Sequence, residues 1–308
     1  MILCCGEALI DMIPTGTASG QDAFVAHSGG AVFNTAIALG RLRRKVGLLS
    51  GVSNDLFGTQ LATVLGDSHV AVDYLVRSDR PTTLAFVKLE NGHASYAFYD
   101  ENTAGRMITT DVLPKITPDV GALFFGGISL ACEPCADTYA AFLDREGAER
   151  AVVLDPNIRP GFAPDEGRYR ARLMAMLARA DMVKVSDEDL AWIMPDHAGL
   201  QAQAAALQAC GPAVVLVTRG ADGAIGLLPD GDMVEVAAER ADVIDTVGAG
   251  DTFNAGVMAR LDEMGLMTKA ALRRLGPEDL KQALSFGAKV AAITVSRAGA
   301  NPPWLDEL

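Results

Sequence analysis

One stretch near the carboxyl end, Asp245-Thr-Val-Gly-Ala-Gly-Asp-Thr-Phe-Asn-Ala-Gly-Val-Met258, says most about both fold and chemistry. The apolar spacing after Gly248-Ala249-Gly250 predicts a helix that begins at these small residues. Free N–H groups at a helix N-terminus bind anions, and small residues let the backbone approach the anion closely. A Cβ at Gly250 would crowd that anion and would disfavour the strained backbone conformation expected at this position. We therefore expect Gly248, Ala249 and Gly250 to form an anion-binding site.

Asp251 lies in the first turn of the same helix. A carboxylate beside an anion is repulsive unless it takes part in the chemistry, and the role of general base for a hydroxyl nucleophile fits this place. The alternative is that Asp251 and Thr252 only cap the helix. No Gly-Lys-Ser/Thr follows, so the stretch is not a P-loop, and Gly6 does not begin the glycine pattern of a nicotinamide-binding enzyme.

Short apolar runs alternate with helical patterns along most of the chain, which predicts an α/β fold with a doubly wound, mostly parallel sheet flanked by helices. The expected strands are apolar on both faces, as buried parallel strands are. They cover residues 2–5, 46–50, 122–125, 151–154, 182–185 and 214–217. The expected helices cover residues 32–42, 136–146, 168–180, 200–210, 249–264 and 280–295.

Two strand-like runs, 83–90 and 93–100, interrupt this alternation. Asn91-Gly92 joins them and favours a hairpin turn, because both residues accept a positive φ. Residues 22–27 would add a third strand. We expect a small β-sheet that acts as a lid over a site, and a plain surface hairpin is the alternative. The lid would comprise 12–27 and 83–100, and the α/β core 1–11, 28–82 and 101–308.

The composition narrows the possible partners. A net charge of -13 disfavours nucleic acid and anionic membrane, and no apolar run is long enough to span a membrane. Five cysteines without a visible export signal fit a reducing compartment, so we expect a cytoplasmic protein. Cys132 and Cys135 form a C-x-x-C pair, but no second pair stands at zinc-site spacing, so we interpret the pair as incidental.

Residues 245–258 resemble the second signature of the ribokinase-like (PfkB) carbohydrate kinase family at every restricted position, and the similarity runs from Gly6 to Pro302. The resemblance implies an ATP-dependent sugar kinase with Asp251 as catalytic base and the 248–250 backbone as anion hole. It also implies ATP, Mg²⁺ and K⁺ as cofactors, and a homodimer through the lid sheet.

Other segments resemble the sugar site of that family. The resemblance assigns sugar contacts to Asp11, Gly29, Gly30, Asn34, Phe98 and Arg159, in addition to Asp251. Residues 29–34 are similar to the first signature, although Val32 departs from the small residue or proline usual there. Taken without the family, Asp11 and Asn34 are helix or strand caps, the two glycines a tight turn, and Arg159 a surface ion-pair partner.

The nucleotide and metal sites are also assigned by resemblance. ATP contacts are expected from Thr218, Gly220, Gly223, Gly248, Gly250 and Asn254. Asp189 stands where the family has the glutamate of its magnesium motif, and would orient a magnesium-bound water. Asp187 and Glu188 beside it also read as first-turn acids favoured by the helix dipole. Asp245 and Val247 are similar to residues that hold a monovalent cation in several relatives.

Fructose is the expected sugar, with fructose 6-phosphate as product, because residues 6–11, 98–104 and 155–160 look more like bacterial fructokinases than ribokinases or adenosine kinases. The runner-up is a 2-keto-3-deoxygluconate kinase. Kinases of that group often carry Arg where Asp100 stands, and an Asp would repel the substrate carboxylate, with Arg159 as its one plausible partner. A nucleoside kinase and a catalytically idle sugar-binding relative also stay open.

Overall fold

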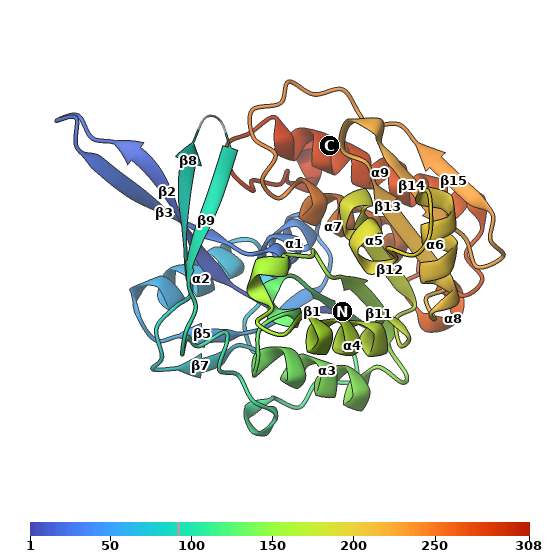
Figure 1. The fold of residues 1–308 in the computed structure, drawn as a ribbon, viewed down its shortest axis with the longest axis horizontal. Helices are drawn as coiled ribbons and strands as arrows, with labels where there is room; N and C mark the ends of the chain where they lie inside the picture. The colour runs from blue at the N-terminus through green and yellow to red at the C-terminus, as the bar shows by residue number, and fades with distance from the viewer. Residues whose placement is uncertain (91–92) are drawn as a thin grey trace.

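The computed structural model describes the backbone of residues 1–90 and 93–308 and, except for 88–95, their side chains (Figure 1). Its largest element, within the described chain, is a nine-stranded sheet. From one edge to the other the strands are β15 (Met233–Val236), β14 (Ala224–Leu227), β13 (Val214–Thr218), β12 (Met182–Ser186), β11 (Ala151–Asp155), β10 (Ala122–Gly126), β1 (Ile2–Cys5), β4 (Val46–Leu49) and β6 (Val70–Ala71). The strands from β13 to β6 are parallel, and β14 and β15 add an antiparallel edge.

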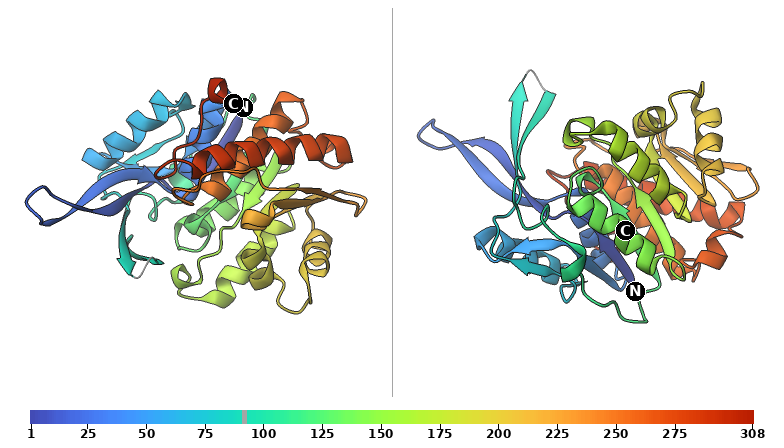
Figure 2. Two further views of the ribbon diagram at one scale, coloured as in Figure 1. Left: turned by 90° about the horizontal axis from the view of Figure 1, so that it is seen from above. Right: turned by 60° about the horizontal axis from the view of Figure 1, so that its bottom comes forward.

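Helices cover both faces of this sheet because successive strand residues point to opposite sides. Phe124 packs into one apolar cluster and Phe125 into the other. The first cluster is covered by α1 (Ala31–Arg41), α2 (Leu56–Asp67), α7 (Ala249–Glu263), α8 (Lys269–Leu272) and α9 (Pro277–Val295). The second is covered by α3 (Cys135–Glu146), α4 (Glu166–Leu177), α5 (Asp187–Ile193) and α6 (Leu200–Ala209). The left panel of Figure 2 shows the two helical layers.

A second, four-stranded sheet extends from the main body (Figures 1 and 2). Its strands, in order, are β3 (Asp22–Gly29), β2 (Leu9–Gly16), β8 (Leu84–Glu90) and β9 (His93–Tyr99). The strands β5 (Gly51–Ser53) and β7 (Val76–Ser78) form a small parallel pair. The turn expected at Asn91-Gly92 lies outside the described residues.

The doubly wound α/β fold with a smaller sheet is confirmed, and the expected strands and helices lie within a few residues of their predicted ends. The elements that were not predicted include α2, β14 and β15. The expectation that every central strand is apolar on both faces was wrong for β12, which carries the buried Lys184. In the described residues, no helix is both long and apolar enough to cross a membrane. The division into core and lid domains stays a prediction.

Candidate active site

A cavity of about 1080 Å³ opens at the carboxyl ends of the parallel strands. Thr218, at the end of β13, lines it from the central sheet, and Asp11 and Phe98 line it from the second sheet. Asp251, in the first turn of α7, lies on the same wall. Parallel α/β sheets usually bind their ligands at this edge, and here the second sheet supplies part of the enclosure.

Asp251 is buried, and its environment favours proton uptake near neutral pH. Its Oδ2 accepts a 2.9 Å hydrogen bond from Asn34 Nδ2 on α1. Burial raises the pKa of Asp251 to about 7; the Asn34 hydrogen bond and Lys184 oppose this shift, while Asp155 adds to it. A carboxyl group with a pKa near the working pH is suited to accept a proton from a substrate hydroxyl.

The backbone before Asp251 follows the expected small-residue turn. Gly248 has a φ of 76° and is the N-cap of α7, and a Cβ there would lie 2.6 Å from the Ala300 side chain. Gly250 does not have a positive φ, so the backbone strain expected at Gly250 is found at Gly248 instead. A Cβ on Gly250 would meet Lys184 Nζ at 3.0 Å. The backbone conformation of Gly248 therefore requires glycine, whereas a side chain at Gly250 would crowd the Lys184 ammonium group.

A second cavity of about 560 Å³ meets the first at the beginning of α7. Thr218, Ala249 and Gly250 line both cavities, while Gly220 and Gly223 line the second. Gly223 has a φ of 85°, and a Cβ there would lie 2.2 Å from the Val236 carbonyl oxygen. The two spaces thus share a wall at the predicted anion site.

The position of Asn254 differs from that of the other residues expected to contact ATP. It is fully buried in α7 and is not among the described residues that line the two cavities. Its amide nitrogen and oxygen have no hydrogen-bond partner within the described chain. A direct contact between Asn254 and a nucleotide stays a prediction.

Asp11 and the two glycines of the first signature form one packed unit. A Cβ on Gly29 would lie 2.2 Å from Asp11 Oδ2, so Gly29 leaves the space that the carboxylate occupies. Gly30 has a φ of 108° and is the N-cap of α1. Burial raises the pKa of Asp11 to about 6. Phe98, which lines the same cavity, packs edge-on against Phe162 with ring centroids 4.2 Å apart.

Both carboxylate oxygens of Asp189 contact backbone N–H groups. Oδ1 accepts from Ile158 N at 3.0 Å and Oδ2 from Ser186 N at 3.2 Å, which completes a capping box on α5. Asp189 and Glu188 nevertheless line the larger cavity. Magnesium in nucleotide sites is typically held by one or two carboxylates together with water and phosphate. These two side chains fit that donor set, although the described residues contain no cluster of three or more metal-ligand side chains.

Asp245 connects two loops. Its Oδ1 accepts from Val247 N at 3.0 Å and its Oδ2 from Gly299 N at 2.8 Å. Val247 lines the larger cavity, and its side chain is exposed. Residues 245–247, which resemble a monovalent-cation loop, therefore contact the backbone at Gly299 through Asp245. The cation itself stays a prediction.

The charged residues of the cavity wall to which no role was assigned from the sequence include Glu7, Arg106 and Lys184. Glu7 accepts hydrogen bonds from Ala31 N at 3.0 Å and Ser129 N at 3.3 Å, so it holds the start of α1. Arg106 lies 3.5 Å from Asp100, and Lys184 lies 3.0 Å from Asp155. An isolated lysine inside an otherwise apolar strand was the signal that could have identified Lys184.

Arg159 reaches the larger cavity, as expected, but it is not the one positive charge on the wall. Its side chain is exposed, and its Nη1 donates to the Ile158 carbonyl oxygen at 2.8 Å. Arg106 lines the same cavity. The expectation that Arg159 alone is available to a substrate carboxylate was therefore wrong. The side chain of Arg106 is, however, already paired with Asp100.

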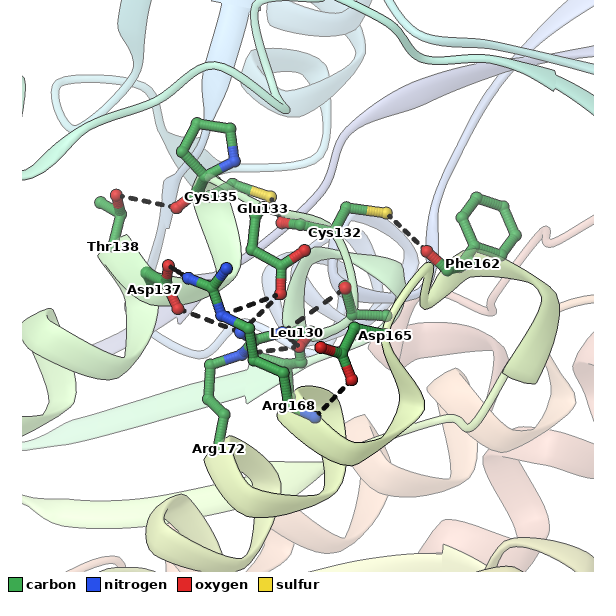
Figure 3. A network of polar contacts seen from close by, with 12 residues as sticks. Leu130, Cys132, Glu133, Cys135, Asp137, Thr138, Phe162, Asp165, Arg168 and Arg172 are labelled. Atoms are coloured by element: carbon green, nitrogen blue, oxygen red, sulfur yellow. Dashed lines mark hydrogen bonds and ion pairs between the residues drawn. The ribbon is translucent and has the colours of Figure 1, made fainter.

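A network of hydrogen bonds and ion pairs surrounds the C-x-x-C segment (Figure 3). Cys132 and Cys135 are buried free thiols, and Cys135 Sγ donates to the Cys132 carbonyl oxygen at 2.8 Å. Arg172 reaches across from α4 and donates to the Leu130 carbonyl oxygen and to Glu133. Burial raises the pKa of both thiols, which disfavours the reactive thiolate. The segment supports the wall near Cys132, which lines the cavity.

Comparison with known proteins gives a consistent result. The model of the "pfkB family carbohydrate kinase" matches residues 1–307. A fructokinase from Rhizobium leguminosarum bv. trifolii is 50% identical over 285 residues, which cover 91% of this chain and 86% of that protein. Probable fructokinase-6 of Arabidopsis thaliana, described as chloroplastic, is 30% identical over 98% of this chain and 79% of its own.

Solved structures give the same picture. A fructokinase from Xylella fastidiosa with bound ATP superposes with a TM-score of 0.88 at 30% identity, over 97% of this chain and 93% of that one. A fructokinase from Vibrio cholerae O395, in a form with fructose, ADP and calcium ion, has a TM-score of 0.82 at 26% identity, over 97% and 94% of the two chains.

Proposed function

The chain belongs to the pfkB family of carbohydrate kinases, and from this we propose that it is an ATP-dependent fructokinase that converts D-fructose to fructose 6-phosphate. The observation that carries the proposal is the position of Gly250 on the walls of both cavities, with Asp251 next in the chain and buried. A hydroxyl acceptor in one cavity and a phosphoryl donor in the other would meet at this point.

The proposed reaction is an in-line phosphoryl transfer. The fructose hydroxyl oxygen forms a bond to the γ-phosphorus, the hydroxyl proton passes to Asp251, and the bond between the γ-phosphorus and the β,γ-bridging oxygen breaks to release ADP. The N–H groups at the start of α7 stabilise the negative charge on the transferred group. Asn34 orients the Asp251 carboxylate through its 2.9 Å hydrogen bond.

Magnesium is the proposed divalent ion. Asp189, with Glu188 beside it, would hold magnesium through water, and the ion would neutralise phosphate charge during transfer. Potassium is the proposed monovalent ion, near Asp245 and Val247; a fructokinase variant from Vibrio cholerae O395 has been described in a fructose, ADP and potassium ion bound form. Both assignments are tested by titrating each ion into the assay separately.

The sugar cavity supports a neutral, hydroxyl-rich substrate. Asp11 and Asn34 supply polar groups suited to hydroxyls, while Asp100 is buried and engages the positive charge of Arg106 at 3.5 Å. A keto-acid such as 2-keto-3-deoxygluconate would bring a carboxylate beside Asp11 and Asp100. Arg159 at the exposed side of the cavity could contact that carboxylate. Recognition by Arg106 would require Arg106 to leave Asp100, which would then be buried without its positive partner at a cost of several kcal/mol.

The deciding experiment offers the protein ATP and magnesium with fructose, 2-keto-3-deoxygluconate, ribose, glucose and adenosine in separate reactions, and measures ADP release. Fructose should give the highest kcat/KM, with the keto-acid lower by on the order of a hundredfold or more. Preference for the keto-acid would refute the fructose assignment and leave the kinase mechanism in place. If none of the five compounds leads to ADP release, the result would favour a catalytically idle sugar-binding relative.

We also propose a homodimer through the second sheet in the cytoplasm. Phe24, Val25 and Tyr99 of that sheet are large apolar or aromatic side chains exposed to solvent, and such side chains are commonly covered by a partner. Sedimentation of the wild type and of Phe24→Glu tests this. A wild type that sediments as a monomer at micromolar concentration would refute the dimer.

A further inference from the structure

Lys184 places a positive charge inside the central sheet, directly beside the predicted anion site. The side chains of Lys184 and Asp155 are each 4% exposed, and Lys184 Nζ lies 3.0 Å from Asp155 Oδ2. The β11–β12 register pairs Leu154 with Val183, so Asp155 and Lys184 are the next neighbours along the two strands. Met182, two residues earlier, packs into the cluster beneath α7, and residues two apart share a face.

The ion pair with Asp155 does not occupy all the hydrogen-bond donors of the Lys184 ammonium group. An ammonium has three N–H donors, and among the described residues Asp155 is the acceptor it contacts. Lys184 and Gly250 both line the larger cavity, and a Cβ built on Gly250 would lie 3.0 Å from Nζ. The remaining donors therefore lie next to the backbone that begins α7.

The negative charges around Lys184 also favour a cation at this point. The carboxylates of Asp155, Asp189 and Asp251 all act on Lys184. Burial alone would lower the pKa of Lys184, but these three carboxylates outweigh it, so the pKa is raised and the ammonium stays charged at neutral pH. Without Lys184, a polyphosphate beside Gly250 would be repelled by the carboxylates of Asp155, Asp189 and Asp251.

The alternative is that the ion pair between Lys184 and Asp155 only stabilises the fold. The chain contains a second lysine–aspartate ion pair with which it can be compared. Lys269 Nζ lies 2.7 Å from Asp181 Oδ2, and Asp181 is fully buried just before the opposite end of β12. Lys269 is not among the described residues that line either cavity. Lys184 lines the larger cavity beside Gly250, whereas Lys269 is 28% exposed and shares Asp181 with Arg273, which lies 3.3 Å from Asp181 Oδ1.

On the basis of the proposed function, we propose that Lys184 is a further catalytic residue whose ammonium donates hydrogen bonds to the transferring phosphoryl group. No bond to Lys184 forms or breaks during the reaction, and its proton stays on Nζ. It stabilises the oxygens of the transferred group while the bond to ADP breaks and the bond to the sugar forms. The group it contacts is present in ATP and absent from ADP.

The test uses three variants of the full chain. Lys184→Met removes the positive charge. The double variant Asp155→Asn with Lys184→Met removes both charges of the pair, so that the Asp155 carboxylate is not left buried and unpaired. Lys269→Met is the control at a lysine–aspartate ion pair away from the cavities. Calorimetry with magnesium measures the affinity for ADP and for the non-hydrolysable analogue AMP-PNP, and steady-state assays measure kcat and KM for fructose. Thermal unfolding identifies variants that have not folded.

We expect both Lys184 variants to lose about 100-fold or more in kcat, with KM for fructose changed by less than about threefold. AMP-PNP affinity should fall about tenfold or more, while ADP affinity changes by less than about threefold. Lys269→Met should lower thermal stability and leave all of these values near wild type.

Two outcomes would overturn the role of Lys184. One is a kcat of the double variant within about threefold of wild type; the other is an equal loss of AMP-PNP and ADP affinity, which would indicate a general structural effect. The comparison of AMP-PNP with ADP does not depend on the identity of the sugar. If the wild type phosphorylates no sugar, the proposed function fails, and the comparison of AMP-PNP with ADP still decides whether Lys184 contacts the terminal phosphoryl group.

Discussion

Asn34 and Asp251 are 217 residues apart in the chain, and Asn34 Nδ2 donates a 2.9 Å hydrogen bond to Asp251 Oδ2. Thr35 adds a 3.3 Å hydrogen bond from its hydroxyl to the Asp251 carbonyl oxygen. These contacts fix the starts of α1 and α7 against each other. The two sequence signatures therefore form one site, in which the segment expected to bind sugar also orients the expected base.

Replacing Asp251 by Asn should separate binding from chemistry. Asn has nearly the same shape, so α7 and the anion site should stay in place while proton acceptance is lost. We expect kcat to fall by roughly 10²–10⁴-fold, with ATP affinity within a few-fold of wild type. Asp262→Asn, in the same helix and partly exposed next to Arg44, is the control and should be close to wild type. Turnover of Asp251→Asn within a few-fold of wild type would exclude Asp251 as the base.

The rate should also report the pKa of Asp251. The carboxylate form is the active one, and the groups that act on this carboxyl include Asn34, Asp155, Lys184 and Glu7. Because burial raises its pKa to about 7, kcat/KM should rise with pH up to about 7 and then level off. Asp11, whose pKa is raised to about 6, contributes a second rise at lower pH. A profile already level at pH 5 would contradict this assignment.

The same shift predicts that Asp251 destabilises the folded protein. The folded state holds the Asp251 proton more tightly than the unfolded state, whose carboxyl has the ordinary value of 3.8. Stability is therefore lost as pH rises from about 4 to about 7, and the loss is constant above that. Asp251→Asn lacks this penalty and should be more stable, by on the order of 4 kcal/mol at most, at pH 8.

Urea unfolding at several pH values measures this difference. The gap between Asp251→Asn and wild type should widen between pH 4 and pH 7 and stay constant at higher pH. A gap that is independent of pH would show that the buried carboxyl titrates normally, and would also remove the basis of the predicted rate profile.

The sequence predicted the parallel strands well because a buried parallel strand leaves a plain signal, a short apolar run. It missed β15 because an antiparallel edge strand alternates, as the exposed and buried residues of Met233–Val236 do. It missed β14 because this buried strand has only four residues and contains Gly226. It also missed α2, whose glycines, Gly58 and Gly66, weaken the helical pattern. These misses concern the edges of the fold, where tertiary contacts decide the structure.

The residues of the site were predicted where a motif was contiguous, and missed where two segments meet. Asp251 and the glycines before it lie in a single run. Lys184 and Asp155 become partners only because β11 and β12 are neighbouring strands in the sheet. The order of strands in the sheet cannot be predicted from the sequence of either segment alone. Arg106 likewise reaches the cavity from a loop without regular structure. Local patterns carry no information about these distant neighbours.

Gly29 should control sugar binding through Asp11. The Cβ of a Gly29→Ala variant would lie 2.2 Å from Asp11 Oδ2, so the carboxylate has to move. We expect KM for fructose to rise about tenfold or more, with KM for ATP little changed, since small displacements of positioning groups are costly. Gly16→Ala in the same sheet is the control, because its Cβ has no atom within 4 Å. An unchanged KM in Gly29→Ala would place the sugar away from Asp11.

Gly250→Val tests the shared wall of the two cavities. The backbone of Gly250 accepts a larger residue without strain because its φ is not positive, so the variant should fold with a melting temperature near wild type. The added Cβ would lie 3.0 Å from Lys184 Nζ, which is a close contact, and the side chain would take up space where a phosphoryl group is expected. Turnover should therefore fall by about 100-fold or more, and AMP-PNP affinity should fall with it.

Gly66→Val, at an exposed glycine of α2 with no atom within 4 Å of its Cβ, makes the same chemical change away from the site and should leave both values unchanged. If Gly250→Val is stable and fully active, the glycines form only a turn and the phosphoryl group binds elsewhere.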